Sequence, residues 1–224
     1  TDELREVIHQ NIDPLGLKGL ELGQLCLSGE LAEEYASGGR CYEVFSELKR
    51  EGLANRFVLE VFPWSSEVAL WALRGGYPEG VVDGYIFYLN PLQRFPSNEL
   101  WDELIARSEP MIAMRTVSGG NVYSLRDIPG YAWKPYLQER AAQVAPIFER
   151  SGIQNWTEFC VRFAHSFPLV RATVGATSKL ENLREFLAAA ENIEPLPADI
   201  VDEIVQLHYR WSDEFDMKAE LWSM

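Results

Sequence analysis

Two stretches of the chain join an apolar run to a loop of small residues, a pattern that suits binding of a phosphate group. The first is 110–120, which ends in Gly119 and Gly120, and the second is 171–178, which passes through Gly175 just ahead of a helical pattern. Small residues at a strand end expose main-chain amides, and a helix N-terminus adds a partial positive charge. Both loops are therefore candidate sites for a phosphate-bearing ligand. The alternative interpretation is that they are ordinary tight turns between strand and helix.

Five apolar runs predict the strands of a parallel sheet that is covered on both faces. They lie at 20–27, 56–62, 82–89, 111–117 and 171–174. Helical patterns alternate with them, most clearly at 197–211, where every third or fourth residue is apolar. This alternation indicates βα units with right-handed crossovers. We predict one α/β domain over residues 1–224, with a C-terminal tail at 212–224.

Composition excludes several classes of protein. The 224 residues can bury a full core, and the net charge of −14 argues against a nucleic-acid partner. No apolar run approaches membrane-spanning length. Cys26, Cys41 and Cys160 are odd in number and widely spaced, and the three histidines show no ligand spacing, so we expect neither a disulfide framework nor a metal site. These features predict a cytoplasmic protein without a membrane partner.

From about residue 1 to about residue 211 the order of segments resembles the later two-thirds of an aldo-keto reductase. The segments that carry this resemblance are 15–22, 47–56, 112–120, 161–178 and 187–197. The resemblance implies a (β/α)₈ barrel of the TIM type. Because such a barrel needs eight strands and only five are legible, it also implies that the first three strands are not present in this sequence.

The resemblance further implies an NADP(H)-linked oxidoreductase acting on a carbonyl or alcohol substrate. The family's catalytic Asp, Tyr and Lys would lie in the portion not present, and Cys26 occupies the position of its catalytic His. We expect Cys26 to be a packed core thiol, since no partner base lies near it in the sequence. The site is thus altered, and the chain can be inactive by itself. The alternative is a non-catalytic barrel that binds a nucleotide or a protein partner.

The two ends of the implied NADP(H) site differ. Val61 and Phe62 replace the family's Ser-Asn pair that holds the nicotinamide carboxamide, and Tyr85 replaces its Gln. The phosphate end is better preserved. The implied cofactor-binding residues are Met114, Arg115, Ser118, Gly119, Gly120, Gly175, Thr177, Ser178, Lys179 and Arg184.

Three further expectations concern charged residues and partners. Glu60 and Tyr85 are weak catalytic candidates, and Glu60 is expected to form an ion pair with Arg115, or else to line an anion or sugar site. The acidic cluster in 30–34 is expected on a solvated loop. Five strands of a barrel leave two unpaired edges, so we predict a homo-oligomer or a complementing segment.

Overall fold

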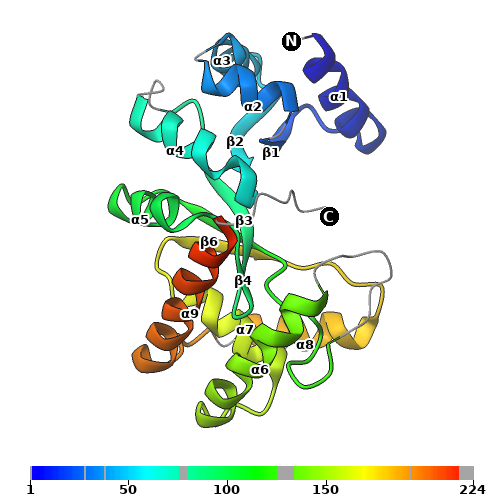
Figure 1. The fold of residues 1–224 in the computed structure, drawn as a ribbon. Helices are drawn as coiled ribbons and strands as arrows, with labels where there is room; N and C mark the ends of the chain where they lie inside the picture. Colours follow the sequence, from blue (N-terminus) through cyan, green and yellow to red (C-terminus); the bar gives the residue numbers. More distant parts are fainter. Residues whose placement is uncertain are drawn as a thin grey trace. The chain divides into compact units, whose positions relative to one another are not determined.

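The computed structural model describes residues 2–27, 29–37, 39–75, 80–125, 134–191 and 193–216. The chain divides into two compact units, each described here by itself (Figure 1). Unit 1 comprises Thr1–Ile86 with Glu99–Pro110, and unit 2 comprises Phe87–Asn98 with Met111–Met224. The prediction of a single domain stays a prediction.

Unit 1 contains parallel strands in the order β1-β2-β3. β1 (Leu20–Cys26) pairs with β2 (Ala54–Glu60), and β2 pairs with the first residues of β3 (Gly84–Asn90). The helical elements of this unit are α1 (Asp2–Ile12), η1 (Asp13–Leu15), α2 (Gly29–Ala36), α3 (Cys41–Arg50), η2 (Pro63–Ser65), α4 (Ser66–Gly75) and most of α5 (Asn98–Ala106). The rings of Phe45 on α3 and Phe57 on β2 lie 5.2 Å apart in the core.

A half-buried ion pair fixes the register of unit 1. Lys49 Nζ on α3 lies 2.6 Å from Asp83 Oδ2, and the same oxygen accepts a hydrogen bond from the Phe57 main-chain amide at 2.8 Å. One carboxylate therefore joins α3, β2 and the residue preceding β3. Because a charge-assisted contact with restricted solvent access is stronger than an exposed one, this contact contributes to the alignment of the strands.

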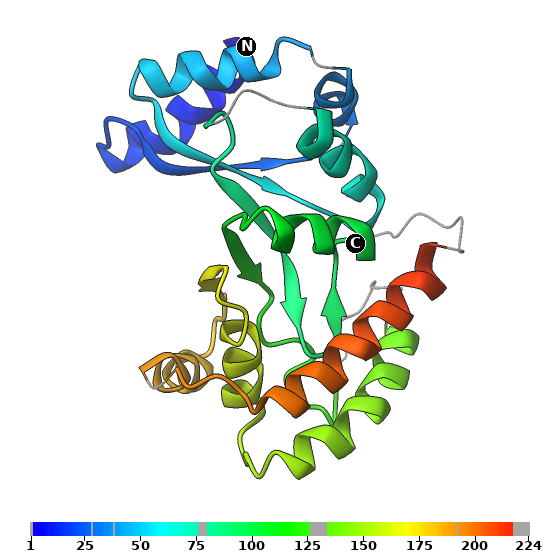
Figure 2. The same ribbon diagram turned by 90° about the vertical axis from the view of Figure 1, so that its left-hand side faces the viewer.

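Unit 2 contains a short hairpin and a second parallel pair of strands. The later part of β3 pairs antiparallel with β4 (Gln93–Arg94), and β5 (Met111–Met114) pairs parallel with β6 (Val170–Val174). Its helices are α6 (Lys134–Arg150), α7 (Trp156–His165), α8 (Leu180–Glu191) and α9 (Ala198–Asp216), with α7 packed against α8 (Figure 2).

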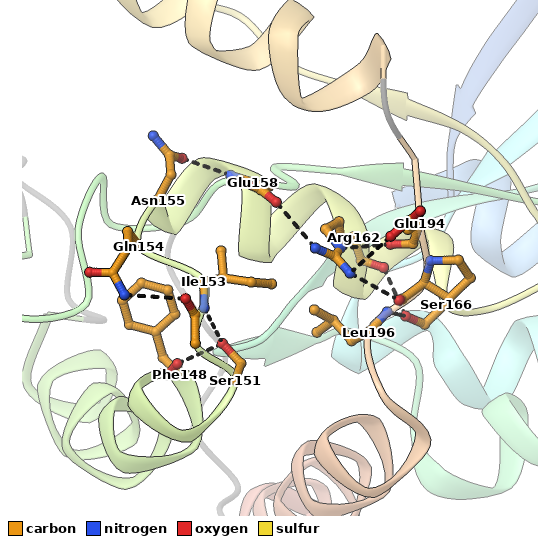
Figure 3. A network of polar contacts seen from close by, with 12 residues as sticks. Phe148, Ser151, Ile153, Gln154, Asn155, Glu158, Arg162, Ser166, Glu194 and Leu196 are labelled. Carbon is orange, nitrogen blue, oxygen red and sulfur yellow. Dashed lines mark hydrogen bonds and ion pairs between the residues drawn. The ribbon is translucent and has the colours of Figure 1, made fainter.

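A polar network holds α7 in place at both ends (Figure 3). Asn155 Oδ1 accepts a hydrogen bond from the Glu158 amide at 2.8 Å and caps the helix N-terminus. Near the other end, Arg162 donates to the Glu194 carbonyl at 2.8 Å, and the Ser166 hydroxyl accepts from the Leu196 amide at 2.9 Å. These contacts make α7 a fixed support for the elements beside it.

The α/β class and the five predicted strands are confirmed, but some boundaries differ. The strand predicted at 111–117 ends at Met114, because Arg115 adopts a left-handed backbone with φ 48° that a strand cannot contain. The loop predicted for 30–34 is wrong, since these residues lie in α2. Its single buried residue, Tyr35, packs inward while Glu30 occupies the favourable first turn. Residues 212–216 continue α9, and the remainder of the predicted tail lies outside the described residues.

Candidate functional site

In unit 2 the loop between β6 and α8 has the features expected of an anion site. Thr177 Oγ1 accepts hydrogen bonds from the Lys179 amide at 3.1 Å and from Asn182 Nδ2 at 3.3 Å. The hydroxyl thus fixes the residues just before α8, whose first amides have no acceptor within the helix. Lys179 and Arg184 are exposed on the same loop and first turns of the helix, as are Gly175 and Ser178.

Gly175 is favoured by close packing rather than by its backbone angles. A Cβ placed on it would lie 3.3 Å from the ring of Phe186 on α8, which is tighter than ordinary contact. The absence of a side chain therefore lets α8 approach the end of β6. This brings the helix N-terminus and the basic side chains of Lys179 and Arg184 to one end of the strand.

The second predicted loop, after β5, is tied into the interior by its serine. Ser118 is buried, its hydroxyl donates to Gln93 Oε1 at 2.9 Å, and its carbonyl accepts from Trp156 Nε1 at 3.2 Å. Gly119 and Gly120 follow with φ 73° and 76°, a left-handed backbone that favours glycine. Among the described residues, no main-chain acceptor receives a hydrogen bond from either glycine amide. Ser118 therefore positions the loop, and the two glycine amides are its available donors.

Arg115 and Met114 precede this loop at the end of β5, where both are half-buried. The Arg115 guanidinium lies over the ring of Tyr88 at 4.9 Å, and the Arg115 carbonyl accepts from Asn90 Nδ2 at 3.0 Å. The end of β3 therefore fixes the end of β5 within unit 2.

A buried polar network that the sequence interpretation missed continues from Gln93. Its amide donates to the Tyr136 hydroxyl at 2.9 Å, and burial raises the pKa of that phenol. Arg140 lies over the rings of Tyr136 and Trp211, at 4.6 Å from each, and burial lowers its pKa to about 10. The available signal was a pair of polar residues, 93–94, shortly after the largely apolar run 85–89.

In unit 1 the structure brings together Cys26, Glu60 and a third residue, Gln24. Cys26 and Glu60 are register partners on adjacent parallel strands, and Gln24 Nε2 donates to Glu60 Oε2 at 2.8 Å. Tyr85 pairs with Leu59 instead, so it lies on the opposite face of the sheet from Glu60, and it is buried. Gln24 was missed, although its spacing of two from Cys26 on a strand was the signal.

The expectation that Cys26 is a packed core thiol is wrong, because its side chain is exposed. Within the described part of unit 1, β1 pairs with β2 alone, and the face that carries positions 22, 24 and 26 is accessible. An edge strand leaves such residues in solvent, whereas the same positions inside a complete barrel would be enclosed. The predicted pair of Glu60 with Arg115 stays a prediction.

The positions that replace the family's carboxamide-binding pair are apolar and enclosed. Val61 and Phe62 are fully buried, and the Val61 amide donates to the Ile86 carbonyl at 3.0 Å. Phe62 stacks on Trp64 with ring centroids 4.7 Å apart and planes 6° from parallel. Neither side chain offers a hydrogen bond to an amide.

The described ranges lack two features that would point to other classes of site. They contain no group of three or more His, Cys, Asp or Glu side chains arranged to hold a metal ion. None of the helices in those ranges has the length and apolar character needed to cross a membrane.

No protein-family model matches the chain, and no curated protein does. An aldo-keto reductase from Bacillus halodurans in its holo form matches with 16% identity and a TM-score of 0.64, over 98% of this chain and 68% of its own. Its apo form matches with 16% identity and a TM-score of 0.63, over 98% and 70%.

A thermostable aldo-keto reductase in complex with the inhibitor epalrestat matches with 16% identity and a TM-score of 0.63, over 92% of this chain and 66% of its own. The chain thus spans about two-thirds of the length of these solved structures. Its fold is that of the aldo-keto reductases.

Proposed function

We propose that this chain binds NADP(H) through unit 2 and takes part in oxidoreduction of a carbonyl or alcohol substrate. The observation that carries the proposal is the loop from β6 to α8. There Thr177 fixes the loop just before α8, and the exposed cations Lys179 and Arg184 lie on that loop and the first turns of the helix. Backbone amides and cations of this kind suit the phosphate on the adenosine ribose.

The other residues of unit 2 fit the phosphate end of the cofactor. The amides of Gly119 and Gly120 are suited to a pyrophosphate, and Ser178 adds a hydroxyl beside Lys179. Met114 ends the neighbouring strand β5 and Arg115 follows it, where a nucleotide can lie against them. When bound, NADPH supplies a hydride to a carbonyl carbon.

The fit is poorer at the nicotinamide end. The buried apolar side chains of Val61 and Phe62 offer no partner to a carboxamide, and an unpaired buried polar group costs about 1–3 kcal/mol. This observation favours a second candidate function, a barrel that binds the nucleotide without hydride transfer. The exposed Cys26 and Gln24 and the half-buried Glu60 are polar residues that can face a substrate in unit 1.

The test is a titration of the protein with NADPH, with NADH as the control. Binding is monitored by fluorescence energy transfer from the protein's tryptophans to the cofactor. We expect saturable binding with a preference for NADPH, and a loss of about tenfold in that preference on Arg184→Gln, the effect of one charge-assisted contact. Lys18→Gln, which removes an exposed cation from unit 1, is the matched control and should bind normally. Absence of binding at millimolar cofactor would overturn both candidates.

A carbonyl screen on the binding-competent protein then separates the two functions. Turnover of NADPH with any substrate supports the oxidoreductase. Tight binding without turnover supports the nucleotide-binding barrel.

A further inference from the structure

The helix that carries the candidate phosphate site is weakly anchored by apolar contacts. On α8, Leu180, Leu183 and Leu187 are 58%, 43% and 52% exposed. In the described part of this helix only Ala189 is buried, and Phe186 is half-buried against Gly175. Because little apolar surface of α8 is removed from water, polar contacts have an unusually large share in fixing its position.

One such contact joins α8 to the N-terminus of α7. The Glu185 carboxylate accepts a hydrogen bond from Asn155 Nδ2 on one oxygen and from the Thr157 hydroxyl, at 3.1 Å, on the other. Thr157 is 7% exposed, so its hydroxyl has limited access to water. Glu185 itself is exposed and Asn155 is half-buried, so the buried Thr157 hydroxyl is the donor that solvent competes with least.

Both donors are themselves fixed. Asn155 caps α7 through its other side-chain atom, Oδ1, which accepts from the Glu158 amide (Figure 3). The residue between the donors, Trp156, stacks with Phe159 at 5.5 Å and donates to the Ser118 carbonyl. The Glu185 carboxylate is therefore held against the rigid part of unit 2, one residue after the candidate ligand Arg184.

We propose that Asn155 and Thr157 are positioning residues for the phosphate site, acting through Glu185. They hold α8 so that Thr177, Lys179 and Arg184 keep their arrangement, and they keep the Glu185 carboxylate engaged with donors instead of free beside a bound phosphate. The affinity part of this proposal rests on the proposed NADP(H) function, whereas the attachment of α8 does not.

The decisive variant is Thr157→Val, which keeps the shape of the side chain and removes the hydroxyl. Hydrogen exchange measured by mass spectrometry should become faster across 175–187 and stay unchanged across 156–165. Affinity for NADPH should fall by about tenfold, as expected for one lost charge-assisted hydrogen bond, with a smaller loss for NADH. Thr157→Ser restores the hydroxyl and should restore both readouts.

Two further variants separate positioning from charge. Glu191→Gln removes a carboxylate from the exposed end of the same helix and should leave exchange and affinity unchanged. The double variant Thr157→Val with Glu185→Gln also removes the carboxylate that Thr157→Val leaves with one donor fewer. The preference for NADPH over NADH should then return in part, while hydrogen exchange across 175–187 stays fast.

The outcomes distinguish this proposal from the proposed function. If the hydrogen-exchange rate across 175–187 in Thr157→Val equals that of the wild type, the proposed attachment of α8 is overturned, whatever the protein binds. Faster exchange with unchanged NADPH affinity would overturn the positioning role alone. If the wild-type protein binds no NADPH, the proposed function fails, and faster exchange still supports the attachment.

Discussion

The hydroxyl of Ser118 donates to Gln93 Oε1 at 2.9 Å, so the serine of the glycine loop faces the interior of unit 2. Removal of this hydroxyl leaves the buried Gln93 oxygen with one partner fewer. We expect Ser118→Ala to lower the free energy of unfolding by about 1 kcal/mol. NADPH affinity should fall as well, because Ser118 positions the loop whose main-chain amides are the predicted contacts. Urea unfolding and the cofactor titration check the two parts, and a selective loss of affinity would contradict the interior role.

Gly119 is constrained twice, by its backbone and by its neighbour. It has φ 73°, and a Cβ placed on it would overlap the side chain of Leu125. Gly152 has the same φ of 73° and nothing within 4 Å of such a Cβ, so it is a matched control. We expect Gly119→Ala to lower the free energy of unfolding by about 1–3 kcal/mol more than Gly152→Ala, the usual cost of overpacking. Equal losses in urea unfolding would mean that Leu125 moves aside freely.

Asp83 serves two partners in unit 1, Lys49 and the Phe57 amide. Asp83→Ala should lower the free energy of unfolding by about 1–3 kcal/mol, because a partly buried donor then lacks an acceptor. The exposed pair of Glu21 with Arg56, also on unit 1, provides the contrast. Glu21→Gln should leave the melting temperature of the protein unchanged, since exposed pairs contribute little. Similar effects of the two variants would show that the location of Asp83 has no special importance.

His208 on α9 predicts a dependence of stability on pH. Burial, and then the positive charges of Arg94 and Arg140, lower its pKa below the ordinary value. Below about pH 6.5 the unfolded chain takes up a proton that the folded chain excludes. Stability that is present above that pH should therefore be lost on acidification, by about 1 kcal/mol per pH unit.

Urea unfolding between pH 7.5 and 5.5 measures this effect. Burial also lowers the pKa of His165, so the wild-type slope contains both histidines. The difference in slope between the wild type and His208→Phe isolates the buried ring. Parallel slopes for the two proteins would contradict the assignment to His208.

The sheet edges predict self-association or the need for a complementing segment. Among described strands, β1 pairs with β2 alone and β6 with β5 alone, and each carries an exposed apolar residue, Leu22 and Val174. Open edges with exposed apolar side chains favour pairing with another chain. Sedimentation of the 224-residue chain should show oligomers, and Leu22→Lys should reduce them. A clean monomer with cooperative melting would contradict the prediction.

Much of the fold followed from local patterns. Apolar runs of four to eight residues separated by helical spacing are enough to predict parallel βα units, and all five of those strands are present. The short α2 was missed because eight residues between glycines carry a weak helical pattern, and its one buried residue, Tyr35, gains its energy from tertiary packing.

The site divides in the same way. The resemblance to the family selected Thr177, Lys179 and Arg184, which lie on one loop and the first turns of a helix and so are neighbours through local structure. Only the tertiary structure decided that Cys26 is exposed, that Ser118 faces Gln93, and that two residues at the N-terminus of α7 hold Glu185. Each of these depends on which segments pack together. In the last two cases the segments that meet lie 25 to 30 residues apart along the chain. Sequence periodicity indicates which residues share one face of a helix or strand. The burial and hydrogen-bond partners of those residues depend on which other element packs against that face.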